Sequence, residues 1–191
     1  PTPYCLMFGQ GNQHFLQRLS SVAARRSPPD RGRGKQAVVV SAAACLSEAL
    51  FEPWQRADRT DSFRWDLGEA NRYALRALKP SGDPTATTTQ HGANRLAALA
   101  LPLLPACAVS RRGEPRTLAV GARYDRSGTI RITWPIWARP ARLSGILASL
   151  DLTPARQMKA LDVVAYMEAE RISLGKFMNV APARMSSGKV Y

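Results

Sequence analysis

Short apolar runs separated by glycine-containing turns fill residues 106–137, and they restrict the possible folds more than any other stretch. The runs ACAVS, RTLAVGA and TIRITW alternate with RRGEP and RYDRSG. Short runs bounded by turns of this kind are typical of strands joined as hairpins. The pattern predicts an antiparallel β-meander with strands at 106–110, 116–122 and 129–134.

Helical periodicity dominates the N-terminal half. Within 12–26, four apolar residues recur at helical spacing behind a capping Asn12: Phe15, Leu16, Leu19 and Val22. The Ala-rich run 36–53 predicts a buried helix ended by Pro53. Residues 92–101 predict a helix that stops at Pro102, and 141–150 predict a short helix.

Three further segments complete the expected architecture. Residues 27–35, SPPDRGRGK, predict a mobile basic loop that either orders on RNA or DNA or remains a solvated linker. Residues 54–84 predict loop and short helix, and 162–180 predict a strand pair or a helix turning into a strand. The expected class is α+β in a single domain, 1–191, with a helix-rich N-terminal half and strands in the C-terminal half.

The charge balance points to a polyanionic partner. The chain has 27 basic and 14 acidic residues, a net charge of +13, and 22 of the bases are arginine. A GC-rich genome would explain arginine over lysine, but it would not explain the excess of bases over acids. Arginine pairs with phosphate and stacks on bases, so we expect contact with nucleic acid.

Several other classes of protein are disfavoured. The sequence has no apolar run of membrane-spanning length and no secretory signal, so we expect a cytoplasmic protein. The chain begins without methionine, which suggests trimming. Cys5, Cys45 and Cys107 are far apart, which argues against a zinc site or a disulfide framework. Cys45 and Cys107 lie in apolar runs and are expected to be buried, and no cofactor or metal is expected.

Arginines interleaved with aromatics are the main candidates for nucleic-acid contacts. In SFRWD and NRYALR they flank Trp65 and Tyr73, which could stack on bases or belong to the core. The full set of expected contacts is Arg25, Arg26, Arg31, Arg33, Lys35, Arg64, Trp65, Arg72, Tyr73, Arg76, His91, Asn94, Arg95, Arg171 and Lys176.

The stretch HGANRLAALALPLLP, residues 91–105, allows two interpretations. A polar opening at a helix start could bind an anion through Asn94, Arg95 and His91. It could equally be a buried polar clamp that locks the helix to the aromatic and acidic loop. Gly92 would provide a backbone bend, and three leucines are expected in the core: Leu96, Leu99 and Leu103.

Evidence for catalysis is weaker. Asp61, Asp66 and Glu69 form the densest acidic stretch and could serve a metal-dependent nuclease with His14 or His91. Because arginines surround them, ion pairs that fix a loop are the simpler interpretation. Two other features, Gly-x-Gly in FGQGNQHF and the pair Glu168 and Glu170, lack the residues that would complete a site. A protein–protein scaffold with a basic surface is the third alternative.

Several segments together resemble proteins encoded with type I-G (formerly I-U) CRISPR–Cas effector genes. They are MFGQGNQHFL, FRWDLGEANRYAL, HGANRLAALALPLL, TWPIW and ERISLGKFMN, which span about residues 5–181. The resemblance implies an antiviral role within an RNA-guided surveillance complex, in contact with guide RNA, target DNA or neighbouring subunits.

The chain also departs from other CRISPR proteins. It has no helicase P-loop and no His-Asp nuclease pair, and it has no clear glycine-rich loop of the guide-processing type. The resemblance therefore implies a non-catalytic, nucleic-acid-contacting subunit of a ribonucleoprotein complex, without assigning which subunit.

Overall fold

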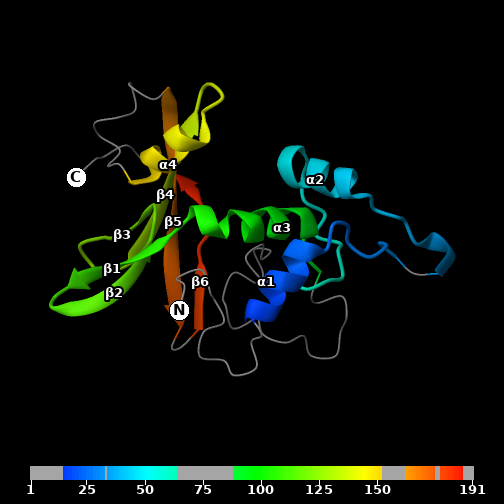
Figure 1. Ribbon diagram of the computed structural model, residues 1–191, viewed down its shortest axis with the longest axis horizontal. Helices are drawn as coiled ribbons and strands as arrows, with labels where there is room; N and C mark the ends of the chain where they lie inside the picture. The colour runs from blue at the N-terminus through cyan, green and yellow to red at the C-terminus, as the bar shows by residue number, and fades with distance from the viewer. Residues whose placement is uncertain (1–14, 33, 64–87, 152–161, 175–176, 187–191) are drawn as a thin grey trace. The chain divides into compact units, whose positions relative to one another are not determined.

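The computed structural model describes residues 15–32, 34–63, 88–151, 162–174 and 177–186 (Figure 1). The helices lie in the N-terminal half and the strands in the C-terminal half, which confirms the α+β class. Contacts group the chain into two compact units. One comprises 5–102 with 174–178, and the other comprises 1–4, 103–173 and 179–191. The single domain expected from chain length remains a prediction.

The N-terminal unit is built from short helices. Its elements are α1 (Phe15–Ala24), the 3-10 helix η1 (Gly34–Gln36), α2 (Ala42–Phe51) and α3 (His91–Ala100). α3 contacts both α1 and α2. A small core of Val22, Phe63 and Ala98 lies among them, and the rings of Phe15 and Phe63 are 5.4 Å apart.

The helix predicted over 36–53 is wrong at its N-terminal end, because α2 begins only at Ala42. Val38 exchanges backbone hydrogen bonds of 2.8 and 2.9 Å with Arg31 and is therefore extended. A β-branched residue accepts this conformation readily. Ser41 caps α2, and its hydroxyl accepts from the Ala44 N–H. The helix is also less buried than expected, since Phe51 is 82% exposed and its buried side holds Cys45 and Glu48.

The expected leucine core of α3 is also wrong. Leu99 is 52% exposed and Leu103 is 40% exposed, whereas Ala98 is buried and Leu96 is half-buried. The buried side of α3 holds His91, Gly92, Asn94 and Ala98, so Leu99 lies on its exposed side. Helix α3 runs into a 3-10 turn, η4 (Leu101–Leu103), which accommodates Pro102.

The C-terminal unit contains two antiparallel sheets. Strands β1 and β2 form a two-stranded ribbon, and the larger sheet has the order β3-β4-β5-β6, with β7 also paired to β5. The bounds are β1 (Ala106–Arg111), β2 (Glu114–Ala119), β3 (Ala122–Tyr124), β4 (Ile130–Trp137), α4 (Leu143–Asp151), β5 (Val163–Leu174), β6 (Phe177–Val180) and β7 (Arg184–Met185).

The predicted meander is divided by a tight turn between β2 and β3. Gly121 in this turn has φ +80, which ends the strand expected over 116–122 and separates the ribbon from the larger sheet. Residues 162–180 are the strand pair rather than a helix. Cys107, expected to be buried, is exposed because it lies on the open ribbon.

Candidate nucleic-acid interface

The start of α3 is closed by a carboxylate from the same chain. Asp58 is fully buried, and its Oδ2 accepts from the His91 N–H at 2.8 Å. Asp58 also exchanges two backbone hydrogen bonds of 3.0 Å with Thr89. The first N–H groups of a helix favour an anion, and Asp58 supplies it here. An external anion therefore has no open site at this helix end.

Gln90 ties the same helix start to α2. Its Oε1 accepts from the Ala93 N–H at 2.7 Å, and its Nε2 donates to the Cys45 carbonyl at 3.1 Å. A Cβ added at Gly92 would lie 2.5 Å from that carbonyl oxygen. Gly92 thus permits close helix packing rather than the bend expected from the sequence.

Side chains of the HGANR stretch face inward. His91 is fully buried, and its Nε2 donates to the Arg25 carbonyl at 2.9 Å. Asn94 is 2% exposed; its amide donates to Thr89 Oγ1, and its Oδ1 accepts from the Phe63 N–H. Arg95 is half-buried and donates to the Ala23 carbonyl at 3.1 Å. These residues form the polar clamp, one of the two interpretations of the sequence.

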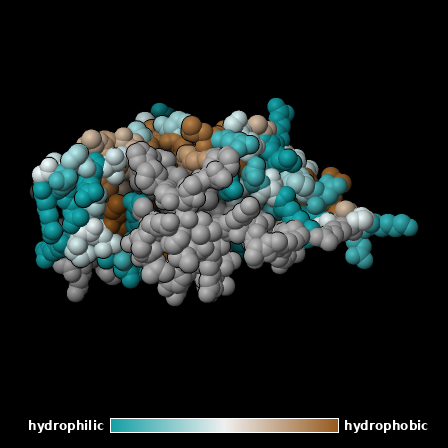
Figure 2. Space-filling view, turned by 90° about the horizontal axis from the view of Figure 1, so that it is seen from below, coloured by the Kyte–Doolittle hydropathy of each residue, from teal (hydrophilic) through white to brown (hydrophobic). Residues whose placement is uncertain are grey.

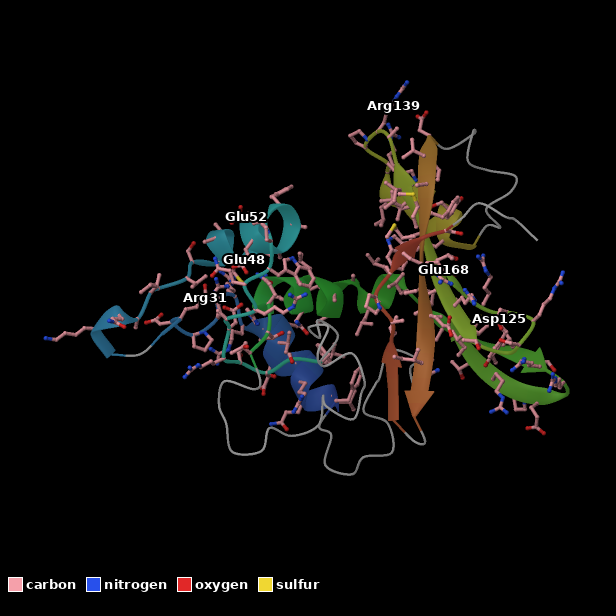
Figure 3. The ribbon with its side chains drawn as sticks, turned by 180° about the vertical axis from the view of Figure 1, so that it is seen from behind. Arg31, Glu48, Glu52, Asp125, Arg139 and Glu168 are labelled. Carbon is pink, nitrogen blue, oxygen red and sulfur yellow. The ribbon has the colours of Figure 1, made fainter. Side chains whose placement is uncertain are left out.

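Arg31 lies against two acidic side chains of the N-terminal unit (Figure 3). Its guanidinium is 2.8 Å from Asp58 Oδ1 and 2.7 Å from Glu48 Oε2. The Asp58 side chain is fully buried and that of Glu48 is 6% exposed. The hydrogen bond to Asp58 raises the pKa of Arg31. Burial would raise the pKa of Glu48, but hydrogen bonds from the Gln55 N–H and from Arg31 outweigh it, and the pKa is lowered. Arg31 therefore neutralises two buried carboxylates, and its expected contact with nucleic acid remains a prediction.

A second arginine gathers carboxylates in the larger sheet. Arg131 on β4 forms ion pairs with three carboxylates. It lies 2.9 Å from Asp125 and 3.6 Å from Glu170, and it also donates a hydrogen bond to Glu168. Asp125 lies in the β3–β4 turn and also accepts from the Ser127 hydroxyl, which together with Arg131 lowers its pKa. Glu168 and Glu170 are thus both held by the Arg131 guanidinium.

These two clusters leave a basic surface elsewhere. Five of the 14 acidic residues contact either Arg31 or Arg131. Among the residues that the structure describes, several exposed bases have no acidic partner: Arg25, Arg26, Lys35, Arg112, Arg116 and Arg142. Figure 2 shows mostly hydrophilic surface on the side of the C-terminal unit where the β1–β2 ribbon lies.

Apart from Arg31, His91, Asn94 and Arg95, which are described above, the expected contacts divide into three groups. Arg25, Arg26 and Lys35 are exposed and remain candidates for phosphate contacts. Arg171 is half-buried, and burial lowers its pKa. The remaining expected contacts lie outside the described residues: Arg33, Arg64, Trp65, Arg72, Tyr73, Arg76 and Lys176.

The acidic stretch is only partly described. Asp61 is exposed and its Oδ2 accepts from the Ser21 hydroxyl at 3.1 Å, whereas Asp66, Glu69 and His14 lie outside the described residues. Within the described ranges, no three His, Cys, Asp or Glu side chains lie close enough together to hold a metal ion. Nor does any described helix have the length and apolar character needed to cross a membrane.

The structure adds basic residues that the sequence reasoning missed. Arg112 and Arg116 are exposed on the β1–β2 ribbon, and Arg111 lies with its guanidinium 4.5 Å from the centre of the Tyr124 ring. The available signal was Arg-Arg-Gly-Glu at the position of a two-residue hairpin turn.

Comparison of the chain with family models, curated proteins and solved structures gives no significant match.

Proposed function

We propose that this protein is a non-catalytic, nucleic-acid-contacting subunit of a type I CRISPR RNA-guided surveillance complex in the cytoplasm. The observation that carries the proposal is a net charge of +13 combined with carboxylates gathered on two arginines. Exposed bases are thereby left to face a polyanion. The resemblance of five segments to proteins of type I-G effector operons supplies the biological setting.

The expected role of the exposed arginines and lysine in the N-terminal unit is to hold backbone rather than to read bases. In RNA-guided complexes, sequence is read by base pairing, and protein side chains contact phosphates. Arg25 and Arg26 follow the end of α1 and are exposed, and Lys35 lies nearby in sequence on η1. These three residues are the described candidates for phosphate contacts in the N-terminal unit.

The first experiment is purification of the tagged protein from its own cells, with identification of co-purifying proteins and RNA. Recovery of CRISPR subunits together with guide RNA is the expected result. Recovery with other proteins but without RNA would favour a scaffold. Recovery without CRISPR subunits and without RNA would contradict the proposal.

A binding titration then tests the phosphate contacts. Arg25→Gln with Arg26→Gln should weaken binding to RNA or DNA and reduce the slope of log affinity against log salt by about 2. The matched control is Arg139→Gln with Arg184→Gln. It removes the same charge from exposed arginines that already lie 4.0 Å from Asp162 and 3.6 Å from Glu168. Equal losses in both double variants would assign binding to net charge alone.

A further inference from the structure

The β1–β2 ribbon extends from the larger sheet of the C-terminal unit, with its turn at the free end (Figure 1). Its six residue pairs run from Ala106 opposite Ala119 to Arg111 opposite Glu114. Within the described residues, neither strand is paired with a third strand. An isolated two-stranded ribbon is marginal in water, so its exposure calls for an explanation.

The turn at the tip has an unusual residue. Arg112 has φ +53 and Gly113 has φ +80, which is the signature of a type I′ hairpin turn. Asparagine or aspartate is the residue preferred before glycine in such turns, because its short side chain tolerates positive φ. Arg112 occupies this place instead and is exposed. The tip of the ribbon thus carries a positive charge at a position where the positive φ favours asparagine or aspartate.

The ribbon is braced within its own unit. The Arg111 guanidinium stacks 4.5 Å from the centre of the Tyr124 ring on β3, and its Nη1 donates to the Gly128 carbonyl at 3.4 Å. Arg111 therefore uses its charge to fix the ribbon against the β3–β4 hairpin. Arg112 and Arg116 remain directed to solvent.

The two faces of the ribbon differ in chemistry. The face shared with Arg111 also carries Arg116, Val109 and Glu114, by the strand register. The opposite face carries only uncharged residues with small side chains: Ala106, Ala108, Ser110, Pro115, Thr117 and Ala119. A ribbon with one narrow uncharged face can approach another surface closely while its arginines contact the rim.

We propose that this ribbon enters the major groove of B-form DNA, with Arg112 contacting a base edge or phosphate and Arg116 a flanking phosphate. The inference rests on the proposed nucleic-acid-binding function and assigns it a ligand. Paired strands lie about 4.8 Å apart, and the major groove of B-form DNA, about 12 Å wide, admits a two-stranded ribbon. The major groove of A-form RNA is too deep and narrow for side chains to read. Duplex DNA is therefore the form that fits.

Arg112→Asn is the deciding variant, because asparagine suits the turn and leaves the hairpin intact. The full-length protein is titrated with a DNA duplex and with an RNA duplex of the same sequence. We expect the DNA duplex to bind more tightly. Arg112→Asn should weaken DNA binding by at least about fivefold, the lower end for one arginine contact to a base. The thermal unfolding midpoint of the variant should not fall.

Arg139→Asn is the matched control, because it removes one exposed positive charge from the same unit, and Arg139 projects away from the sheet in Figure 3. DNA binding by Arg112→Asn equal to that of Arg139→Asn would overturn the ribbon assignment. Equal or tighter binding of the RNA duplex would overturn the choice of DNA. Binding of neither duplex, nor of single strands, by the unaltered protein would instead contradict the proposed function itself.

Discussion

At the scale of single residues, Arg31 and Asp58 bear most directly on the stability of the N-terminal unit. Asp58 accepts from both Arg31 and the His91 N–H, and it has no exposed surface. A buried carboxylate that loses its cation must be neutralised or solvated, and both are costly. The Arg31 side chain is therefore a structural cation, although it lies in a segment whose composition suggests a basic loop.

Replacing Arg31 should destabilise the protein strongly. Arg31→Met keeps much of the side-chain volume but leaves Asp58 and Glu48 buried without their cation. We expect the free energy of unfolding to fall by about 3–5 kcal/mol, measured by urea denaturation. Arg139→Met, which removes an exposed cation 4.0 Å from Asp162, should change it by less than about 1 kcal/mol. Similar effects of the two substitutions would contradict the structural role of Arg31.

At the scale of elements, α3 depends on close approach to α2. The Cys45 carbonyl oxygen accepts from Gln90 and lies 2.5 Å from the place that a Cβ at position 92 would take. The clamp and Gly92 thus act together, because the hydrogen bond from Gln90 to the Cys45 carbonyl requires the backbone of α3 to lie close to that of α2. This explains why a residue with low helix propensity occupies the first turn of α3.

Gly92→Ala should lower stability, although alanine normally favours a helix. The added methyl would meet backbone atoms of Cys45 at 2.5 and 3.0 Å, and such overpacking costs about 1–3 kcal/mol. Gly145→Ala in α4 is the control, because a Cβ there meets nothing within 4 Å. It should leave stability unchanged or raise it by up to about 1 kcal/mol. Thermal unfolding of both variants gives the comparison, and a stabilising Gly92→Ala would contradict the packing.

At the scale of the whole molecule, the distribution of carboxylates matters more than their number. Arg31 in one unit and Arg131 in the other each collect acidic side chains. The surface outside these two clusters is thereby more basic than the ratio of 27 bases to 14 acids alone would make it. This charge favours association with a polyanion and also makes that association sensitive to salt.

Hydrogen exchange tests the single-domain prediction. If the chain unfolds as one domain, Gly92→Ala should lower the protection of amides in β4 and β5 as much as in α3, because all exchange through the same global unfolding. Amide exchange followed by NMR or mass spectrometry measures both sets in one sample. Unchanged protection in β4 and β5 would show instead that the two units unfold separately.

Local patterns were sufficient for the class and for several elements. The period of apolar residues located α1 to within a few residues, the helix expected after Pro140 matches α4, and the glycine turns located β1, β2 and β4. Periodicity and turn chemistry act between near neighbours, so one sequence contains them. The excess of bases is likewise a property of the sequence alone, and it determined the partner that we expect.

Tertiary structure decided which polar residues face inward. Arg31 meets Asp58 across 27 positions, and His91 meets Arg25 across 66. No local pattern specifies such distant partners, so the sequence predicted a nucleic-acid contact for Arg31 and left His91 and Asn94 open between an anion site and a buried clamp. The same reason explains Leu99 and Ala98, because the neighbouring helices determine which side of α3 is buried. The sequence determined how much positive charge the protein has, and folding determined where that charge is neutralised.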